Sequence, residues 1–183
     1  MPRWPWRAEQ SNGSKADSIV AQLPREDATP TLDVASETPQ EDGAGIAPVT
    51  LLRVAEALEK LEIRYLTDGD GSLLALWERH AVLFALEGPS DEILVIRARP
   101  HATVPPDWAD RSYRVVNEWN HTRRFYKAYI GDPTDRGQLP IYAEMQVPLL
   151  SGVHDALVAE LVDCAAVVAL GFVDWLHDEG ALL

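Results

Sequence analysis

Four short strand patterns follow one another between residues 63 and 99, and only short turns separate them. Each pattern is rich in apolar residues, and they cover residues 63–67, 72–77, 81–87 and 92–99. The turns at 68–71, 78–80 and 88–91 have at most four residues each. Because parallel neighbours need a connection of a dozen or more residues, these strands are expected to pair antiparallel. The sequence therefore predicts an antiparallel sheet.

A helix is predicted before these strands, and a second one after them. Apolar residues from Leu51 to Leu61 recur with helical spacing, and Thr50 has the side chain of an N-cap. The consecutive prolines at 105–106 end the strand region, and the second helix starts around Trp108. Its apolar stripe includes Val115, Val116 and Trp119, which lie on one side of a helix.

Two further strand patterns and a last helix complete the chain. The strands cover residues 124–130 and 139–147, and a loop with two glycines joins them. Ser151 is predicted to cap the last helix, which runs to about His177. The main apolar stripe of this helix consists of Leu157, Leu161, Cys164, Val168, Phe172 and Trp175. The order α-β-β-β-β-α-β-β-α predicts an α+β domain, with the helices packed on one face of the sheet.

The first 46 residues have a different character from the rest. Their apolar residues show no periodicity, and Pro, Ser, Thr, Asp, Glu and Gly dominate from Gln10 onward. Such a segment buries too little apolar surface to offset its ordering entropy, so we expect a disordered N-terminal tail at 1–46 and a folded domain at 47–183. The alternative for residues 4–7, Trp-Pro-Trp-Arg, is an aromatic hook that docks on the domain or on a partner.

The composition limits the classes of partner. The net charge of −13 argues against non-specific binding to nucleic acid or to anionic membranes, because both need positive charge. The most apolar stretch, residues 156–176, contains Glu160, Asp163 and Asp174, which disfavour a membrane-spanning helix. The single cysteine excludes an intrachain disulfide, and no apolar leader is evident. We therefore expect a cytoplasmic protein.

The motifs that would carry catalysis do not assemble in this sequence. Ser151, His154 and Asp155 fall within one helical turn and lack the Gly-x-Ser-x-Gly elbow of a hydrolase. The five histidines show no i, i+4 pair and no neighbouring cysteine, so they do not predict a metal site. No phosphate-binding glycine loop is present. The sequence predicts a protein that is not an enzyme and that needs no cofactor.

A basic region stands out in this acidic chain. Residues 97–127 contain seven Arg or Lys and three Asp or Glu, which is a local charge of +4. Strand alternation places Arg97 and Arg99 on one face, with Lys127 of a later strand on the same face if Tyr126 packs inward. The candidate partner-binding residues are Arg97, Arg99, Arg123, Arg124, Lys127, Tyr142 and Glu144. The alternative is a solvated sheet face with local ion pairs.

The residues between the second helix and the next strand resemble a family signature. Asn117-Glu118-Trp119-Asn120, followed by Thr-Arg-Arg at 122–124 and Lys-Ala-Tyr at 127–129, resembles the signature of the YbjN family, the so-called bacterial sensory transduction regulators. Tyr-Ala-Glu at 142–144, Gly-Val at 152–153 and the closing helix at 172–175 also match in order and spacing. The resemblance covers residues 48–178 and implies a fold similar to that of the type III secretion chaperones.

Two functions remain open at this point. The resemblance and the polarised charge predict a regulatory or chaperone-like module, in stress or sensory signalling, that binds an acidic segment of another protein. The alternative is a small-molecule sensor with a ligand near the aromatic residues from Trp119 to Tyr129. A helix that is apolar around much of its circumference also predicts self-association. The resemblance to type III secretion chaperones implies a homodimer.

Overall fold

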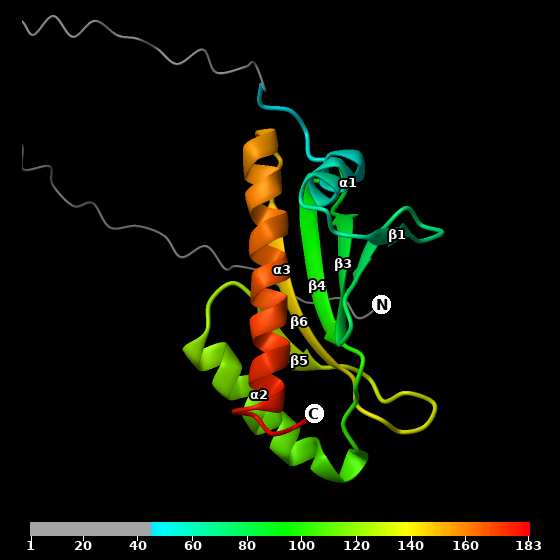
Figure 1. Cartoon of the computed structure of the whole chain (residues 1–183), viewed down its shortest axis with the longest axis vertical. Helices are drawn as coiled ribbons and strands as arrows, with labels where there is room; N and C mark the ends of the chain where they lie inside the picture. Colours follow the sequence, from blue (N-terminus) through cyan, green and yellow to red (C-terminus); the bar gives the residue numbers. More distant parts are fainter. Residues whose placement is uncertain (1–44) are drawn as a thin grey trace, which may run out of the picture. The chain divides into compact units, whose positions relative to one another are not determined.

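The computed structural model describes residues 45–183, which form three α-helices, a short 3-10 helix and six strands (Figure 1). The helical elements are α1 (Leu51–Lys60), η1 (Pro106–Trp108), α2 (Ala109–Thr122) and α3 (Asp155–His177). The strands are β1 (Tyr65–Thr67), β2 (Leu73–Leu76), β3 (His80–Glu87), β4 (Ile93–Pro100), β5 (Lys127–Ile130) and β6 (Ile141–Pro148). The predicted element order is confirmed. The predicted tail lies outside the described residues, except for its last two positions.

The six strands form one antiparallel sheet in the order β1-β2-β3-β4-β6-β5. Strand β6 lies between β4 and β5, so the hairpin of β5 and β6 returns to the strand that precedes α2. The register places Arg97 opposite Glu144 and Glu144 opposite Lys127. Strand β4 and the later hairpin of β5 and β6 therefore present these side chains in one row across the sheet.

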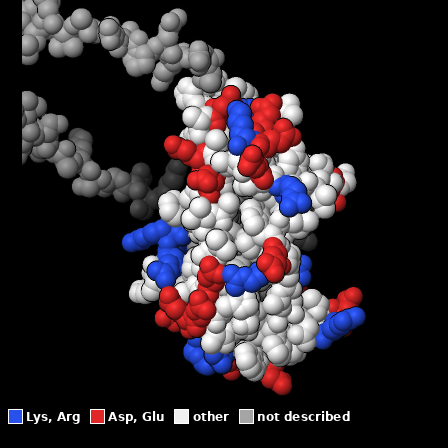
Figure 2. Space-filling view, viewed as in Figure 1, with Lys and Arg blue, Asp and Glu red and all other residues white. Residues whose placement is uncertain are grey.

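One face of the sheet is covered by helices, and the main core lies there. Helix α3 contacts β3 and β4 and packs against α1, and Figure 1 shows it running in front of the strands. Leu58 of α1, Phe84 of β3 and Phe172 of α3 are fully buried in this core. Burying each such side chain contributes about 1.5–3 kcal/mol relative to leaving it exposed. Figure 2, which views this side, shows an uncharged band across the middle of the face.

Helix α3 differs from the prediction at its start and in its buried side. Its N-cap is His154, so Ser151 lies in the preceding turn and does not cap the helix. The buried side consists of Val158, Val162, Ala165, Ala169, Phe172, Val173, Trp175 and Leu176. The predicted stripe is therefore wrong at Leu157, which is exposed, whereas Leu161 and Val168 are half-buried and pack against the edge of the core, and Cys164 is half-buried. The helix is apolar on more than one side, so the spacing of its apolar residues does not show which side packs on the sheet.

The connection from α2 to β5 also differs from the prediction. The strand starts at Lys127 instead of residue 124, because Phe125 has a φ of 60° and cannot be part of an extended strand. Helix α2 is fixed beside β5 by Asn120, whose side chain donates to the Ala128 carbonyl at 2.8 Å and accepts from the Ala128 amide at 2.7 Å. Thr50, by contrast, caps α1 as predicted and accepts from the Arg53 amide.

Candidate functional site

The candidate site is the sheet face opposite α3, which we call the open face. It carries the outward side chains of the strands, namely Leu66, Leu74, Leu76, Ala81, Leu83, Arg97, Arg99, Lys127, Tyr129, Tyr142, Glu144 and Gln146. All of these residues are half-buried or exposed, whereas their strand neighbours such as Val82, Ile96 and Ala143 are completely buried. Strand alternation thus gives the sheet one core face and one accessible face.

The half of the open face on β1, β2 and β3 is apolar. Leu66 and Leu76 are 60% and 46% exposed, and Leu74 and Leu83 are half-buried between them. The register pairs Leu66 with Leu74 and Leu74 with Leu83, so these side chains are contiguous. The apolar residues of this half are not among the binding residues predicted from the sequence. The signal was the run Leu73-Leu-Ala-Leu76, which is apolar on both faces where a strand with one wet face should alternate.

The half on β4, β6 and β5 is polar, and Glu144 is at its centre. The Arg97 guanidinium donates to the Glu144 carboxylate at 2.5 Å, and the Tyr129 hydroxyl and the Gln146 amide donate to it at 3.2 and 2.7 Å. Burial by itself would raise the pKa of Glu144, but the hydrogen bonds from Gln146, Arg97 and Tyr129 outweigh it and lower the pKa below its usual value. Burial and the adjacent Glu144 charge raise the pKa of Tyr129 to about 12. Glu144 is therefore ionised at neutral pH and already paired.

Arg99 and Lys127, two other cations of the open face, form no ion pair within residues 45–183, unlike Arg97. The Arg99 guanidinium lies 5.8 Å from the centre of the Tyr142 ring, and no ion pair joins Arg99 to another residue within 45–183. Within the part of the chain that the structure describes, the Lys127 ammonium donates only to the backbone carbonyl of Asn120, at 3.1 Å. Tyr142 also stacks on Tyr129 with ring centres 5.4 Å apart. Arg99 and Lys127 are thus free to pair with an anion from outside.

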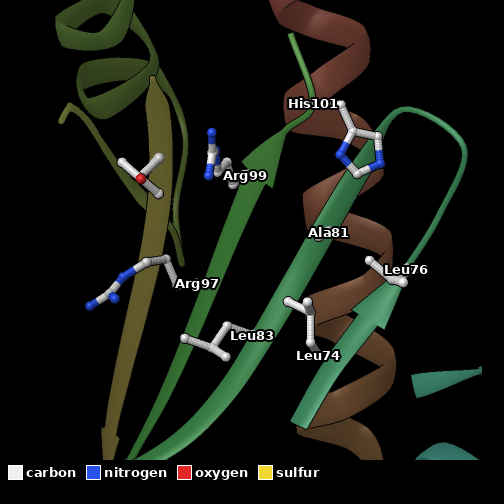
Figure 3. Close-up of a pocket in the computed structure, with 8 residues that line it drawn as sticks. Leu74, Leu76, Ala81, Leu83, Arg97, Arg99 and His101 are labelled. Atoms are coloured by element: carbon white, nitrogen blue, oxygen red, sulfur yellow. The ribbon is translucent and has the colours of Figure 1, made fainter. Parts of the chain in front are cut away.

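A pocket of about 440 Å³ lies where the two halves of the open face meet. It is lined by Leu74, Leu76, Ala81, Leu83, Arg97, Arg99, His101 and Tyr142 (Figure 3). Figure 3 shows the leucines on one side and the two arginines on the other, with α3 behind the sheet. The pocket can therefore hold a group that is apolar at one end and anionic at the other.

The structure does not bring Arg123 and Arg124 to the open face. They follow α2 and line a second pocket of about 430 Å³ beside α3, together with Trp119, Thr122, Phe125, Val168 and Gly171. Arg123 lies 5.8 Å from the Trp119 ring centre and 3.6 Å from the Glu179 carboxylate. The predicted set of basic residues is therefore divided between two surfaces. The division arises because the chain leaves the helix at residue 123 and enters the sheet only at Lys127.

The motif residues Trp119 and Asn120 serve the packing of α2. The Trp119 ring is buried against Phe172 and Trp175, at centre distances of 4.9 and 5.5 Å, and its indole N–H donates to the Tyr126 carbonyl. Asn117 and Glu118 are exposed on the same helix. Tyr129 lies on the open face, one residue after the buried Ala128. Trp119 and Tyr129 therefore lie on opposite faces of the sheet, whereas Trp119 and Phe125, two aromatics of the predicted ligand region, line the same pocket beside α3.

The histidines and acidic residues of the described part of the chain do not gather into a metal site. Residues 45–183 contain no group of three or more His, Cys, Asp or Glu side chains that could hold a metal ion. His80 is buried and its ring stacks on Trp77 with centres 5.0 Å apart, and its Nε2 atom has no hydrogen-bond partner. Desolvation, together with the charges of His101 and Arg79, lowers the pKa of His80 below its usual value. His80 is thus a neutral core residue at pH 7.

The fold, the open face and the α2–β5 junction define a small α+β domain of a known family. Residues 50–178 match the YbjN family, which is described as "Putative bacterial sensory transduction regulator". The match covers more than half of the chain, so the chain belongs to the YbjN family.

One solved structure illustrates the similarity in three dimensions. It is described as "Crystal structure of YbjN, a putative transcription regulator from E. coli", and it superposes with a TM-score of 0.61 at 14% sequence identity. The similarity covers 74% of this chain and 97% of the E. coli chain. At this identity the likeness shows the shared fold. No curated protein sequence matches the chain.

Proposed function

We propose that the protein is a non-enzymatic regulatory module that binds another protein through the open face. The observation that carries the proposal is the antiparallel sheet face that no helix of residues 45–183 covers, on which an apolar half and a cationic half meet at one pocket. The YbjN family description, a regulator, is consistent with a binding role. The residue types agree as well, because Arg and Tyr are enriched in protein interfaces.

The chemistry of the face defines the partner segment. Apolar side chains of the partner would cover Leu74 and Leu83, and an adjacent carboxylate would pair with Arg99. Lys127 lies further along the same face and would take a second acidic group. Glu144 would not repel the partner strongly, because its charge is already compensated by Arg97. The partner is therefore an acidic segment that also carries apolar residues.

The pocket also suits a second candidate, a small organic anion. Its volume of about 440 Å³ is within the range of about 300–1,000 Å³ that is usual for ligand sites. Arg97, Arg99 and His101 would face the anionic group, and the leucines would cover the apolar part. This pocket differs from the ligand region predicted near the aromatic residues from Trp119 to Tyr129, of which Trp119 and Phe125 line the pocket beside α3.

The proposal is tested by quantitative affinity capture with the full-length chain and three variants. Arg99→Glu reverses the free cation of the open face, and Leu83→Asp places a charge in its apolar half. Arg136→Glu is the matched control, because it makes the same charge change at an exposed loop position.

A partner protein should be captured by the wild type and by Arg136→Glu, and at least tenfold less by Arg99→Glu and by Leu83→Asp. Both open-face variants must first show wild-type circular dichroism. If every captured protein is retained by both folded variants, the open face is not the binding surface. If no protein is captured and a small organic anion binds the pocket of the open face, the second candidate is correct.

A further inference from the structure

The outer side of α3 carries several exposed apolar residues beside the exposed acids Glu160 and Asp163, although the helix already buries eight residues in the core. Leu157, Val167 and Leu170 are 44%, 62% and 49% exposed, and Cys164 and Val168 are half-buried. By length and composition the helix is apolar enough to cross a membrane, and only a third of its most apolar window is buried. A strip of exposed apolar residues on one helix indicates a surface that another molecule covers.

A hollow lies at one end of this strip. It is the pocket of about 430 Å³ beside Gly171, and it is bounded by Val168, Trp119 and the residues that follow α2. A Cβ atom at Gly171 would have no neighbour within 4 Å, so packing inside the chain does not require a glycine there. Glycine inside a helix costs about 1 kcal/mol relative to alanine. A contact from outside the chain supplies a physical reason for the glycine.

The rim of the hollow carries a strained aromatic residue. Phe125 has a φ of 60°, and its side chain is 64% exposed. A bulky residue in the left-handed region is unfavourable, and such strain is concentrated at binding sites. The same segment contains Arg124, for which no ion pair or hydrogen bond is found within residues 45–183. The hollow therefore combines an apolar floor, an exposed aromatic ring and a free cation.

The strip and the hollow are complementary under a two-fold rotation. Leu157 and Gly171 each lie seven residues from Cys164, which is about 10 Å along the helix axis in either direction. We propose that a second copy of the chain packs antiparallel against α3 with the two-fold axis near Cys164. The partner's Leu157 then enters the hollow at Gly171, and Leu157 enters the equivalent hollow of the partner. Such an interface is isologous and closes as a dimer.

The charges near the strip favour the same register. Glu160 lies four residues before Cys164, so the antiparallel pairing places it at the level of the partner's Val168, whose hollow is bounded by the partner's Arg124. Glu160, like Arg124, takes part in no ion pair within the described range. Glu160 of each protomer thus lies near the partner's Arg124, so the two-fold axis generates two equivalent ion pairs. Because the open face lies on the other side of the sheet from α3, it stays accessible in this dimer.

The first test measures the mass of the full-length chain and a charge-swap series by sedimentation equilibrium. The wild type should have twice the chain mass of 20.3 kDa at micromolar concentration. Glu160→Arg and Arg124→Glu should each weaken dimerisation about tenfold or more, and the double variant should restore it. Arg136→Glu should leave the dimer unchanged. A monomeric wild type at 100 µM would overturn the proposal, as would a double variant as weak as the single ones.

The second test fixes the register with cysteines in a Cys164→Ser background. The double variant Leu157→Cys, Gly171→Cys should form an intermolecular disulfide on mild oxidation. Each single variant should not, because two copies of either position are about 20 Å apart along the axis in the antiparallel pair. Disulfides that form in either single variant as readily as in the double variant would overturn the antiparallel register.

The third test separates a second copy from a lipid surface as the molecule that covers α3. Gly171→Leu has room inside its own protomer, so it should keep its thermal stability in dilute solution and lose the dimer. Flotation with neutral and anionic phospholipid vesicles should show no binding of the wild type. Monomers that bind vesicles through the outer side of α3, as judged by loss of binding in Val167→Asp, would overturn the proposal.

Discussion

The two faces of the sheet use the same strands for different purposes. On β4, Leu94, Ile96 and Ala98 are completely buried under the helices, whereas Arg97 and Arg99 point to the open face between them. The covered face is almost entirely apolar, and its one buried histidine is neutral. The open face keeps a carboxylate and two arginines in contact with solvent. A residue's place in the alternation therefore decides whether its side chain points into the core under the helices or to the open face.

The largest effect is expected on the covered side, at Trp119. Trp119→Ala removes a ring that contacts Phe172 and Trp175, together with the hydrogen bond to the Tyr126 carbonyl. It should lower the free energy of unfolding by about 3–5 kcal/mol, as measured by denaturant titration. Tyr113→Ala, an exposed position on the same helix, should change it by about 0.5 kcal/mol or less. Equal losses for the two variants would contradict the assignment of Trp119 to the core.

A moderate effect is expected from pH, through His80. The pKa of His80 is lowered in the folded state, so the unfolded chain binds more protons below the usual histidine pKa of about 6.5. Stability should therefore be fully present above pH 6.5 and should fall as the pH drops below it, by at most about 1.4 kcal/mol per pH unit. His80→Phe should flatten this part of the pH profile, because it removes the buried imidazole. An unchanged slope in His80→Phe would exclude this assignment.

The smallest effect is expected on the open face, at Glu144. The lowered pKa of Glu144 means that its contribution is present above the usual glutamate pKa and is lost as the pH falls through the folded-state value. Glu144→Gln should lower stability at pH 7 by about 1 kcal/mol or less, because the pair with Arg97 is partly exposed to solvent. Thermal unfolding at pH 7 and pH 3.5 measures the difference between the variant and the wild type. If Glu144→Gln lost more stability than Trp119→Ala, the open face would contribute more to folding than the covered face, contrary to this account.

The sequence predicted the element order and much of the open face. The alternation of Arg97, Arg99, Tyr142 and Glu144 placed these side chains on one face, and the register confirms that placement together with Lys127. This succeeded because strand periodicity is two and one face of each strand is apolar enough to show which side is buried. The roles of these residues in binding remain predictions.

Other features could not be predicted from local patterns. Arg123 and Arg124 belong to the same predicted set of partner-binding residues as Lys127, but the backbone turns at Phe125 and places these two arginines beside α3. The buried side of α3 was misassigned because the helix is apolar over most of its circumference, so spacing alone favours no side. The role of Asn120 depends on hydrogen bonds to β5, which only the tertiary structure shows.

We propose different functions for the two surfaces: the open face binds a partner protein, and the outer side of α3 binds a second copy of the chain. Arg99→Glu and Arg124→Glu make the same charge change on these two surfaces, so partner affinity measured side by side for the two variants tests the claim most directly. The account predicts that Arg99→Glu loses the captured partner at least tenfold, whereas Arg124→Glu binds it with wild-type affinity. Retention of the partner by Arg99→Glu together with its loss in Arg124→Glu would contradict the account.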